Sequence, residues 1–260
     1  MKRVLVTGAG GQLGRSLQEI TPHYDQLEFL FLEKAELDIT DQGAVRKTFR
    51  DFSPDYCVNC AAYTHVDQAE QTPEPAYAIN VKGVENLTRV CQETDTTLLH
   101  ISTDYVFDGR KKEGYRPEDR PNPINIYGKT KLEGERIIQQ HLQKFFIIRT
   151  SWLYSRKYGP NFYLTILEKA KKGERLSVTD TQIGCPTDAA NLARHILELI
   201  RTGNKDFGIS HFTDGEVMSW YGFAEQIIRE QGLSDQVYLD KGGNYVTFAR
   251  RPENSILIIE

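Results

Sequence analysis

Short apolar segments alternate with amphipathic segments through the first half of the chain. The apolar segments are rich in Val, Ile, Leu and Phe, which is typical of strands buried on both faces of a parallel sheet. The segments between them repeat apolar residues with the spacing of one helix face. The predicted strands are Arg3–Thr7, Glu28–Leu32, Tyr56–Asn59, Thr97–Ser102 and Phe145–Thr150. The predicted helices are Gln12–Ile20, Asp41–Phe52, Pro73–Glu93 and Tyr127–His141.

This alternation predicts an α/β fold with a doubly wound parallel sheet and helices on both of its faces. The second half of the chain is less regular, with helix-like segments at Asn161–Lys172, Asp188–Arg201 and Trp220–Gln231 and a short strand at Ser177–Thr179. A charged, proline-rich loop at Gly109–Asn125 is longer than most loops of a compact domain. We expect this loop to border the ligand site as a lid that becomes ordered on binding.

Composition narrows the class of protein. The chain has 260 residues, of which 39% are apolar and 26% charged, and its net charge is −4. These values indicate a soluble globular protein and argue against one held to nucleic acid or to an anionic membrane by bulk charge. No segment approaches the ~18 consecutive apolar residues of a membrane helix, and the apolar run at the N-terminus is too short for a signal peptide. We expect a cytoplasmic protein with no nucleic-acid and no membrane partner.

The cysteines offer one candidate motif. Cys57 and Cys60 have the spacing of a redox or metal-binding pair. They fall in a predicted strand, however, where residues i and i+3 point to opposite faces. We therefore expect buried, unreactive thiols and no metal.

A glycine-rich segment, Thr7-Gly8-Ala9-Gly10-Gly11-Gln12-Leu13-Gly14, joins the first predicted strand to the first predicted helix. Glycines at positions 8, 11 and 14 permit a tight turn, the close approach of a phosphate and close packing of helix on strand. The free N–H groups and the positive end of the helix would then face a pyrophosphate. The segment predicts a dinucleotide site, with a tight turn that binds nothing as the alternative.

Charged residues near the second strand bear on the choice of dinucleotide. Glu33 ends that strand, where a carboxylate can accept hydrogen bonds from an adenosine ribose, and a solvated loop charge is the alternative. Lys34 and Arg15 would instead attract a 2′-phosphate. These opposing charges predict that both NADPH and NADH are used. Asp38 and Ile39 would flank the adenine, and Asp38 is also a candidate N-cap of the next helix.

Tyr127 and Lys131 are four residues apart in a predicted helix and therefore share one face. A phenol of pKa about 10 is a poor acid at neutral pH, and an adjacent ammonium lowers that pKa. Tyr127 would then protonate a carbonyl oxygen as a hydride reaches its carbon. Thr103, with Ser102 as second choice, ends the fourth strand and would donate a hydrogen bond to the same oxygen. A surface helix and ordinary turn hydrogen bonds are the alternatives.

These motifs, taken in order, resemble the extended short-chain dehydrogenase/reductases and, within them, the dTDP-4-dehydrorhamnose reductase family. The resemblance runs over nearly the whole chain. It is carried by Gly11–Gly14, Asp38–Asp41, Asn59–Asp67, Ser102–Gly109, Asn122–Glu135, Arg149–Trp152, Gln182–Thr187 and Arg251–Ser255. It implies a Rossmann-type sheet and the reduction of the C4 keto group of dTDP-4-dehydro-L-rhamnose to dTDP-L-rhamnose by NADPH or NADH, the last step of dTDP-L-rhamnose synthesis.

The resemblance also implies roles for single residues. At the dinucleotide it places Gly11, Gln12 and Leu13 by the pyrophosphate, Asp38 and Ile39 by the adenine, Ala61, Ala62 and Tyr63 along the cofactor, and Lys131 by the nicotinamide ribose. At the dTDP-sugar it places Thr103, Asp104, Tyr127 and Trp152. An aromatic face such as that of Trp152 also suits a deoxysugar ring, with core packing as the alternative.

The expected domains follow from these roles. Residues 1–151, with a return segment at about 176–201, are expected to form the dinucleotide-binding domain. Residues 152–175 and 202–260 are expected to form a smaller, discontinuous substrate-binding lobe. Family members run some tens of residues further, so we expect a shortened C-terminal end whose apolar run 256–259 needs cover. A homodimer is left open, and the magnesium-binding acidic interface of some members has no match here.

Other functions fit part of the same pattern. A nucleotide-sugar epimerase uses the same Thr, Tyr and Lys but keeps its nicotinamide bound, whereas a reductase exchanges it. A 4,6-dehydratase has a second acid after Thr103-Asp104, where this chain has Tyr105. A non-catalytic regulatory subunit, resembling the beta subunit of methionine adenosyltransferase, would bind a dinucleotide and a partner enzyme. The intact Thr103, Tyr127 and Lys131 favour the reductase.

Overall fold

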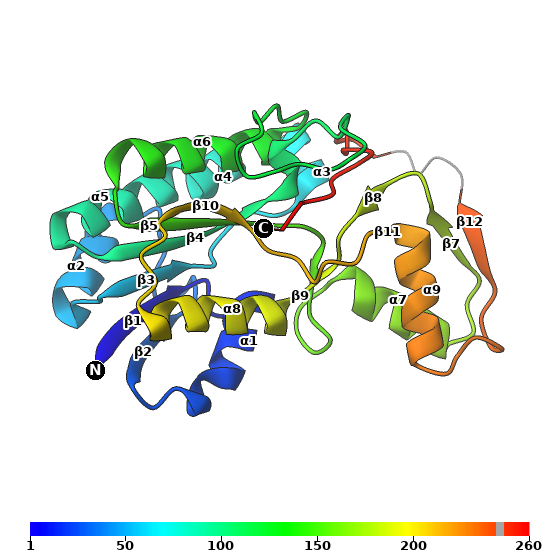
Figure 1. Cartoon of the computed structure of the whole chain (residues 1–260), viewed down its shortest axis with the longest axis horizontal. Coiled ribbons are helices and arrows are strands. Elements are labelled where there is room, and N and C mark those ends of the chain that lie inside the picture. Colours follow the sequence, from blue (N-terminus) through cyan, green and yellow to red (C-terminus); the bar gives the residue numbers. More distant parts are fainter. Residues whose placement is uncertain (243–246, 260) are drawn as a thin grey trace.

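A sheet of six parallel strands forms the centre of the molecule (Figure 1). The computed structural model describes residues 1–242 and 247–259. The strands lie in the order β10-β5-β4-β3-β1-β2. Their bounds are β1 (Lys2–Thr7), β2 (Leu27–Leu32), β3 (Tyr56–Asn59), β4 (Thr97–Thr103), β5 (Phe145–Thr150) and β10 (Gly208–His211). The predicted α/β fold is confirmed, and all the strands predicted for the first half lie in this sheet.

Helices cover both faces of the sheet (Figure 1). Alternate residues of β1 point to opposite faces. Val4 and Val6 pack with apolar side chains of α1 (Gln12–Ile20) and α8 (Ala189–Thr202). Leu5, between them, packs on the other side. That side is covered by α2 (Gln42–Phe52), α5 (Val84–Thr94) and α6 (Ile126–His141). The arrangement is Rossmann-type and doubly wound, as predicted.

The order of the strands reverses at β1, because β2 lies on one side of it and β3 on the other. In open α/β sheets a ligand binds beyond the carboxyl ends of the strands at such a switch point. In this chain the glycine segment 8–11 leaves β1 at that point and leads into α1. The topology therefore positions a site before any side chain is considered.

A smaller lobe lies beyond one end of the sheet, on the right of Figure 1. Its core is aromatic and aliphatic, and Tyr154 and Phe223 are both buried in it. Its helices are α7 (Phe162–Lys171) and α9 (Trp220–Glu230). Its short strands are β6 (Leu153–Tyr154), β7 (Leu176–Thr179), β8 (Ile183–Gly184), β9 (Thr187–Asp188), β11 (Met218–Ser219) and β12 (Leu239–Gly242), which pair as β6–β9, β7–β12 and β8–β11.

Two segments pair differently from the expected division of the chain. β10 falls in the segment expected for the lobe, yet it pairs with β5 and forms the edge of the central sheet. β7 falls in the return segment expected for the sheet domain, yet it pairs with β12 in the lobe. Neither partner is close in sequence, so both pairings depend on tertiary contacts rather than on the local pattern.

The predicted helix Pro73–Glu93 is present as one unbroken helical run, in which α4 (Glu74–Tyr77), a π-helical turn at Ala78–Gly83 and α5 follow one another directly. The π-helical turn was not predicted, nor was the separate short helix α3 (Val66–Gln71) before it. The N-cap assigned to Asp38 is wrong: Oδ1 of Asp41 accepts from the Ala44 N–H at 3.0 Å. The carboxylate of Asp38 is instead bonded to the N–H and hydroxyl of Thr40. Short 3₁₀ turns occupy Thr21–His23 and Asp104–Val106.

The loop 109–125 packs against the C-terminal segment. Tyr115 stacks on Phe107 with ring centroids 4.2 Å apart, and its backbone bonds those of Ile256 and Ile258, both at 2.8 Å. Leu257, between those two residues, is buried against the same aromatic pair. The loop thus covers Leu257, whereas Ile259 at the end of the segment is exposed. No residue of the loop lines the cleft described below, and the expected ordering of this loop on ligand binding stays a prediction.

The cysteine thiols are buried or half-buried. All four thiols are free. Burial raises the pKa of the Cys60 and Cys91 thiols above its usual range, as for unreactive cysteines. Over residues 1–242 and 247–259, no helix combines the length and the apolar character needed to span a membrane.

Candidate active site

A cleft of about 590 Å³ opens at the carboxyl ends of β1, β3, β4 and β5. The helix α6 and the start of α9 contribute to its walls. The sequence-predicted residues that line it are Gly8, Gly11, Gln12, Leu13, Gly14, Ala62, Thr103, Asp104, Tyr127, Lys131 and Trp152. The cleft therefore brings the glycine turn and the predicted catalytic residues together.

The glycine turn is shaped by close backbone contacts. Gly8 has φ +66°, and a Cβ on it would lie 2.6 Å from the backbone nitrogen of Ala61. A Cβ on Gly14 would lie 2.6 Å from Cα of Ala9. Gly11 is the N-cap of α1 and provides no side-chain cap for the first turn. The positive end of α1 therefore faces the cleft as a ready anion site.

The π-helical turn at Ala78–Gly83 holds the segment that follows β3. Oδ1 of Asn80 accepts from the Tyr63 N–H at 2.9 Å, and its Nδ2 donates to the Tyr63 carbonyl at 3.1 Å. The same Nδ2 donates to the hydroxyl of Thr130 on α6, also at 3.1 Å. Asn80 thus ties the segment after β3 to the helix that carries Tyr127. Turns of this kind are frequent at functional sites, but the helical pattern of the sequence gave no sign of this one.

Thr103 and Tyr127 are hydrogen-bonded to each other at the cleft. Thr103 reaches this position because it ends β4, and Tyr127 because Asn125 caps the first turn of α6 through the Gly128 N–H at 2.7 Å. A Cβ on Gly128 would lie 2.1 Å from the Tyr105 carbonyl oxygen. Only glycine at 128 allows α6 to approach the end of β4 so closely.

Asp104 is a buried carboxylate beside this pair, 2% exposed. Oδ1 accepts from the Thr103 hydroxyl at 2.9 Å and Oδ2 from the Ser151 hydroxyl at 3.1 Å. Burial raises the pKa of Asp104 to about 6, against the hydrogen bonds from Ser255, Thr103 and Ser151 that favour the ionised form. The hydroxyl proton of Thr103 is therefore committed to Asp104 while that carboxylate is ionised.

Lys131 is 2% exposed and points along β4. Nζ donates to the Ile101 carbonyl at 2.6 Å and lies 3.1 Å from Nε2 of His100. Burial lowers the pKa of Lys131 to about 8, although the nearby Glu135 and Cys60 act in the opposite direction. Burial also lowers the pKa of His100 well below its usual range, so this imidazole is neutral.

The expected effect of Lys131 on Tyr127 is wrong for this structure. Burial raises the pKa of Tyr127 to about 12, the hydrogen bond with Thr103 opposes this rise, and the charge of Asp104 adds to it. Lys131 is not among the groups that move the pKa, because its amine is directed at His100 and Ile101 instead. Tyr127 therefore holds its proton at neutral pH.

A tryptophan pair closes the side of the cleft that faces the lobe. Trp152 and Trp220 stack with ring centroids 3.6 Å apart and planes 6° apart. Trp152 has φ +48°, a costly conformation for a bulky residue and one that concentrates at functional sites. A Cβ on Gly184 would lie 2.5 Å from the Trp152 ring, so glycine is needed there. The sequence pattern predicted Trp152 as a site residue but placed Trp220 only at the start of a helix.

Some predicted cofactor residues lie outside this cleft. Ile39 is 3% exposed and packs in the core with α5, and Asp38 is bonded to Thr40. Glu33 lies next to the glycine turn, since a Cβ on Gly10 would come 2.9 Å from its Cδ. Ala61 and Tyr63 belong to the backbone segment behind the cleft. Their roles at a dinucleotide remain predictions.

Other lining residues were missed. They are Gly10, Cys60, Thr64, His65, Val66, Ile101, Tyr105, Thr150, Leu153, Gly159, Pro160 and Trp220, while Ser102, the second choice beside Thr103, also lines the cleft. Most follow directly after a predicted strand, and that position is the signal that could have found them. Gly159 and Pro160 have no such signal, because they reach α1 only through tertiary folding: a Cβ on Gly159 would lie 2.9 Å from Cγ of Gln12.

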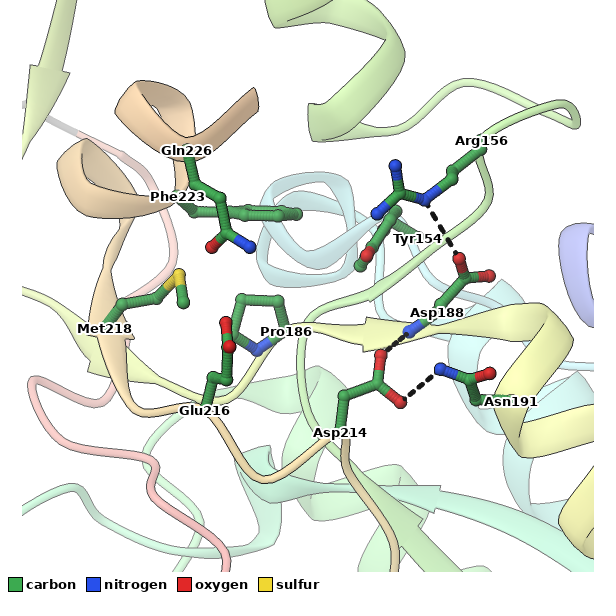
Figure 2. Close-up of a pocket in the computed structure, with 10 residues that line it drawn as sticks. All are labelled: Tyr154, Arg156, Pro186, Asp188, Asn191, Asp214, Glu216, Met218, Phe223 and Gln226. Carbon is green, nitrogen blue, oxygen red and sulfur yellow. Dashed lines mark hydrogen bonds and ion pairs between the residues drawn. The ribbon is translucent and has the colours of Figure 1, made fainter. Parts of the chain in front are cut away.

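A second, polar cleft of about 210 Å³ lies between β6, α8 and α9 (Figure 2). Three of its charged residues, Arg156, Asp188 and Asp214, are linked to one another. Asp188 pairs with Arg156 at 3.3 Å, and the Asp214 carboxylate accepts from the Asp188 N–H and the Asn191 amide, both at 2.8 Å. None of the predicted site residues lines it. Across residues 1–242 and 247–259 no cluster of three or more His, Cys, Asp or Glu could hold a metal ion.

Comparisons with known proteins identify the family. The family model described as the RmlD substrate binding domain matches residues 1–260. The dTDP-4-dehydrorhamnose reductase of Aggregatibacter actinomycetemcomitans is 43% identical over 99% of this chain and 90% of its own length. A crystal structure of dTDP-4-dehydrorhamnose reductase from Bacillus anthracis in complex with NADP is 39% identical, with TM-score 0.94, over 100% of this chain and 92% of that one.

A more distant likeness concerns the fold alone. The UDP-glucose 4-epimerase of Thermus thermophilus, in complex with NAD, has a TM-score of 0.79 at 21% identity over 96% of this chain and 90% of that one. The epimerases thus share the architecture, whereas the full-length family match and the higher identities are with reductases. The chain belongs to the RmlD family, the family of the dTDP-4-dehydrorhamnose reductases.

Proposed function

We propose that the chain reduces the C4 keto group of dTDP-4-dehydro-L-rhamnose to give dTDP-L-rhamnose, with NADPH or NADH as reductant. The observation that carries the proposal is the meeting of Thr103, Tyr127 and Lys131 in one cleft with the glycine turn of α1. The reductase from A. actinomycetemcomitans, at 43% identity, supports the choice of substrate. The structure from B. anthracis, which holds NADP, supports the choice of dinucleotide.

The residues of the cleft fit a dinucleotide. The backbone approach at Gly8 leaves no room for a Cβ, and the first turn of α1 has no side-chain cap. Gly11, Gln12 and Leu13 would hold the pyrophosphate there through backbone N–H groups, and Lys131 would hold the nicotinamide ribose. When bound, the reduced nicotinamide supplies a hydride.

The side chains supply the proton and the orientation. Tyr127, with its pKa at about 12, carries a proton at neutral pH and donates it to the oxygen on C4. Thr103 lies within hydrogen-bonding reach of Tyr127 at the cleft. While Asp104 is ionised, its Oδ1 accepts the Thr103 proton at 2.9 Å, so the proton of Tyr127 stays available for the sugar oxygen. The expected role of Thr103 as a second donor to the substrate stays a prediction, and it requires the Thr103 proton to leave Asp104.

The smaller lobe would hold the sugar nucleotide. Trp152 follows β5 and Trp220 begins α9, so their stacked pair joins the sheet to the lobe. A planar stack of this kind suits a deoxysugar or a base on its exposed side. We infer that the sheet layer binds the dinucleotide and that the lobe completes the sugar-nucleotide side. A homodimer and a cytoplasmic location remain predictions.

The test is an assay with dTDP-4-dehydro-L-rhamnose and, in parallel, UDP-linked keto sugars. Stoichiometric oxidation of NADPH or NADH, with dTDP-L-rhamnose identified by NMR, is expected. Tyr127→Phe is the matched control, because it removes one hydroxyl and leaves the glycine turn untouched. Isomerisation of a sugar without net oxidation would instead identify an epimerase. Dinucleotide binding with no turnover of any keto sugar would identify a regulatory subunit.

A further inference from the structure

A buried chain of polar side chains crosses the carboxyl ends of three strands and ends at Lys131. The Thr7 hydroxyl on β1 lies 2.8 Å from Oδ1 of Asn59 on β3. Nδ2 of Asn59 lies 3.0 Å from Nδ1 of His100 on β4, and Nε2 of His100 lies 3.1 Å from Nζ of Lys131. All of these residues are 0–2% exposed. Each hydrogen bond in the chain therefore needs one donor and one acceptor.

The orientation of the Asn59 amide is fixed by the backbone. The N–H of Ala61 lies 3.1 Å from Oδ1 of Asn59, and a backbone N–H can only donate. Rotating the amide by a half-turn would set an NH₂ group against this N–H and leave two donors facing each other. Oδ1 therefore faces Ala61, and the NH₂ group of Asn59 faces His100.

This orientation fixes the proton on His100. The NH₂ group donates, so Nδ1 of His100 accepts, and the single proton of the neutral ring is on Nε2. The Nε2–H then points at Nζ of Lys131. An ammonium has no lone pair with which to accept this hydrogen bond, whereas a neutral amine has one and still donates to the Ile101 carbonyl.

We propose that Asn59 and His100 are positioning residues that lock the Nε2–H tautomer against Lys131 and so weaken the hold of Lys131 on its proton. The other ionisable groups near Lys131 do not supply this effect. Glu135 is ion-paired with Arg149 at 2.7 Å and accepts from Ser102, and together with the Cys60 thiol it favours the charged lysine. Burial and the locked tautomer both favour the neutral amine.

The consequence for catalysis rests on the proposed function. Tyr127 gives its proton to the sugar oxygen and becomes a phenolate. To return a proton to the phenolate, protonated Lys131 must swing Nζ from His100 and Ile101 toward Tyr127, and the neutral amine left behind then takes a proton from solvent. Against a Tyr127 pKa of about 12 this transfer is favourable, and Lys131, with its pKa at about 8, loses and regains a proton near neutral pH.

The first experiment measures the tautomer of His100 in the wild-type protein. The protein is labelled with ¹⁵N-histidine, and long-range ¹H–¹⁵N spectra report which ring nitrogen carries the proton. The chain has six histidines, and the signal missing from His100→Phe assigns His100. A proton on Nε2 with an unprotonated Nδ1 at pH 7 supports the proposal. A proton on Nδ1, or on both nitrogens, overturns it.

The second experiment reverses the lock. In Asn59→Asp both carboxylate oxygens accept, one from Ala61 and the other from His100, so the ring proton should move to Nδ1 and Nε2 should accept from Lys131. The pKa of Lys131, followed by ¹³C NMR of labelled lysine, should rise by about one pH unit or more. The basic limb of the kcat–pH profile should move with it. A tautomer and a lysine pKa that both stay in place would overturn the proposal.

Two control variants separate the effect of the His100 tautomer on the Lys131 pKa from other effects on that pKa. Thr7→Val removes a hydrogen bond to Asn59 but leaves Ala61 to orient the amide, so tautomer and lysine pKa should be unchanged. His100→Phe adds no charge, and a higher Lys131 pKa in this variant excludes a purely coulombic effect of the new aspartate. An unchanged Lys131 pKa in His100→Phe would count against the proposal. A protein that turns over no sugar nucleotide still reports the tautomer, so the two proposals can fail separately.

Discussion

Replacing Asp104 by Asn should raise the free energy of unfolding at neutral pH. In mild acid the same substitution should raise it by much less. The carboxylate is 2% exposed, and its neighbours Thr103 and Ser151 are neutral hydroxyls rather than cations. Burial raises its pKa from 3.8 to about 6. At 1.36 kcal/mol per pH unit, the ionised carboxylate costs the folded state about 3 kcal/mol.

The sign of the pH dependence follows from proton binding. Between pH 4 and 6 the folded state keeps a proton on Asp104 that the unfolded chain has already lost. Stability from this group therefore falls as pH rises through that window, and the full cost is reached above pH 6. Integrating between pH 4.5 and 7.5 gives about 2 kcal/mol of the total. Asn titrates nowhere in this range and should escape the cost.

The assay is urea unfolding of the wild-type protein and Asp104→Asn at pH 4.5 and 7.5. The difference in unfolding free energy between the two proteins should shift in favour of the variant by about 2 kcal/mol from the lower to the higher pH. Comparing the two pH values cancels any constant effect of the new amide. Asp51→Asn, on the exposed side of α2 beside Lys47, is the control and should show no such gain. A difference in unfolding free energy that does not change with pH would show that ionisation of Asp104 does not destabilise the folded state.

Other outcomes follow from single contacts. Tyr127→Phe should fold and bind dinucleotide but lower kcat by roughly 10²–10⁴-fold, and a wild-type rate in pre-steady-state reduction would exclude Tyr127 as the proton donor. Glu33→Ala removes the carboxylate beside Gly10 and should shift the kcat/KM ratio toward NADPH, whereas a shift toward NADH would remove Glu33 from the ribose site. Gly14→Ala places a Cβ 2.6 Å from Cα of Ala9 and should cost roughly 1–3 kcal/mol in thermal unfolding and weaken dinucleotide binding. Gly222→Ala, whose Cβ would lie 3.5 Å from Cβ of Met218, is its control and should change neither.

The parts of the fold that sequence could predict are those set by local pattern. The apolar runs of β1, β3, β4 and β5 are largely buried, and their composition signals this directly. The glycine turn needs residues without a Cβ, and its glycines can be read directly from the sequence. β10, with the sequence Gly-Ile-Ser-His, has no such run, and it is a strand because the edge of β5 offers it a hydrogen-bonding partner. The π-helical turn at 78–83 likewise depends on Asn80 reaching Tyr63 and Thr130.

The site divides in the same way. Helical spacing placed Tyr127 and Lys131 on one face, and both line the cleft. Spacing does not determine where a flexible amine points, and Nζ turns to His100, 31 residues earlier in the chain. The expected lowering of the phenol pKa failed for this reason. Burial, which no local pattern measures, moves the pKa of Tyr127 up and that of Lys131 down.

The pKa of Tyr127 is raised and that of Lys131 is lowered, and both shifts suit the proposed proton transfers. A reductase must present a protonated phenol to its substrate, so a Tyr127 pKa of about 12 suits the first proton transfer. The enzyme must then return a proton to the phenolate, and this needs a nearby donor whose pKa lies below that of the phenol. Lys131, with a pKa of about 8, is such a donor. The difference between the two groups makes transfer from Lys131 to the phenolate favourable. It is maintained by burial and by the backbone N–H of Ala61, which sets the direction of every hydrogen bond from Asn59 to Lys131.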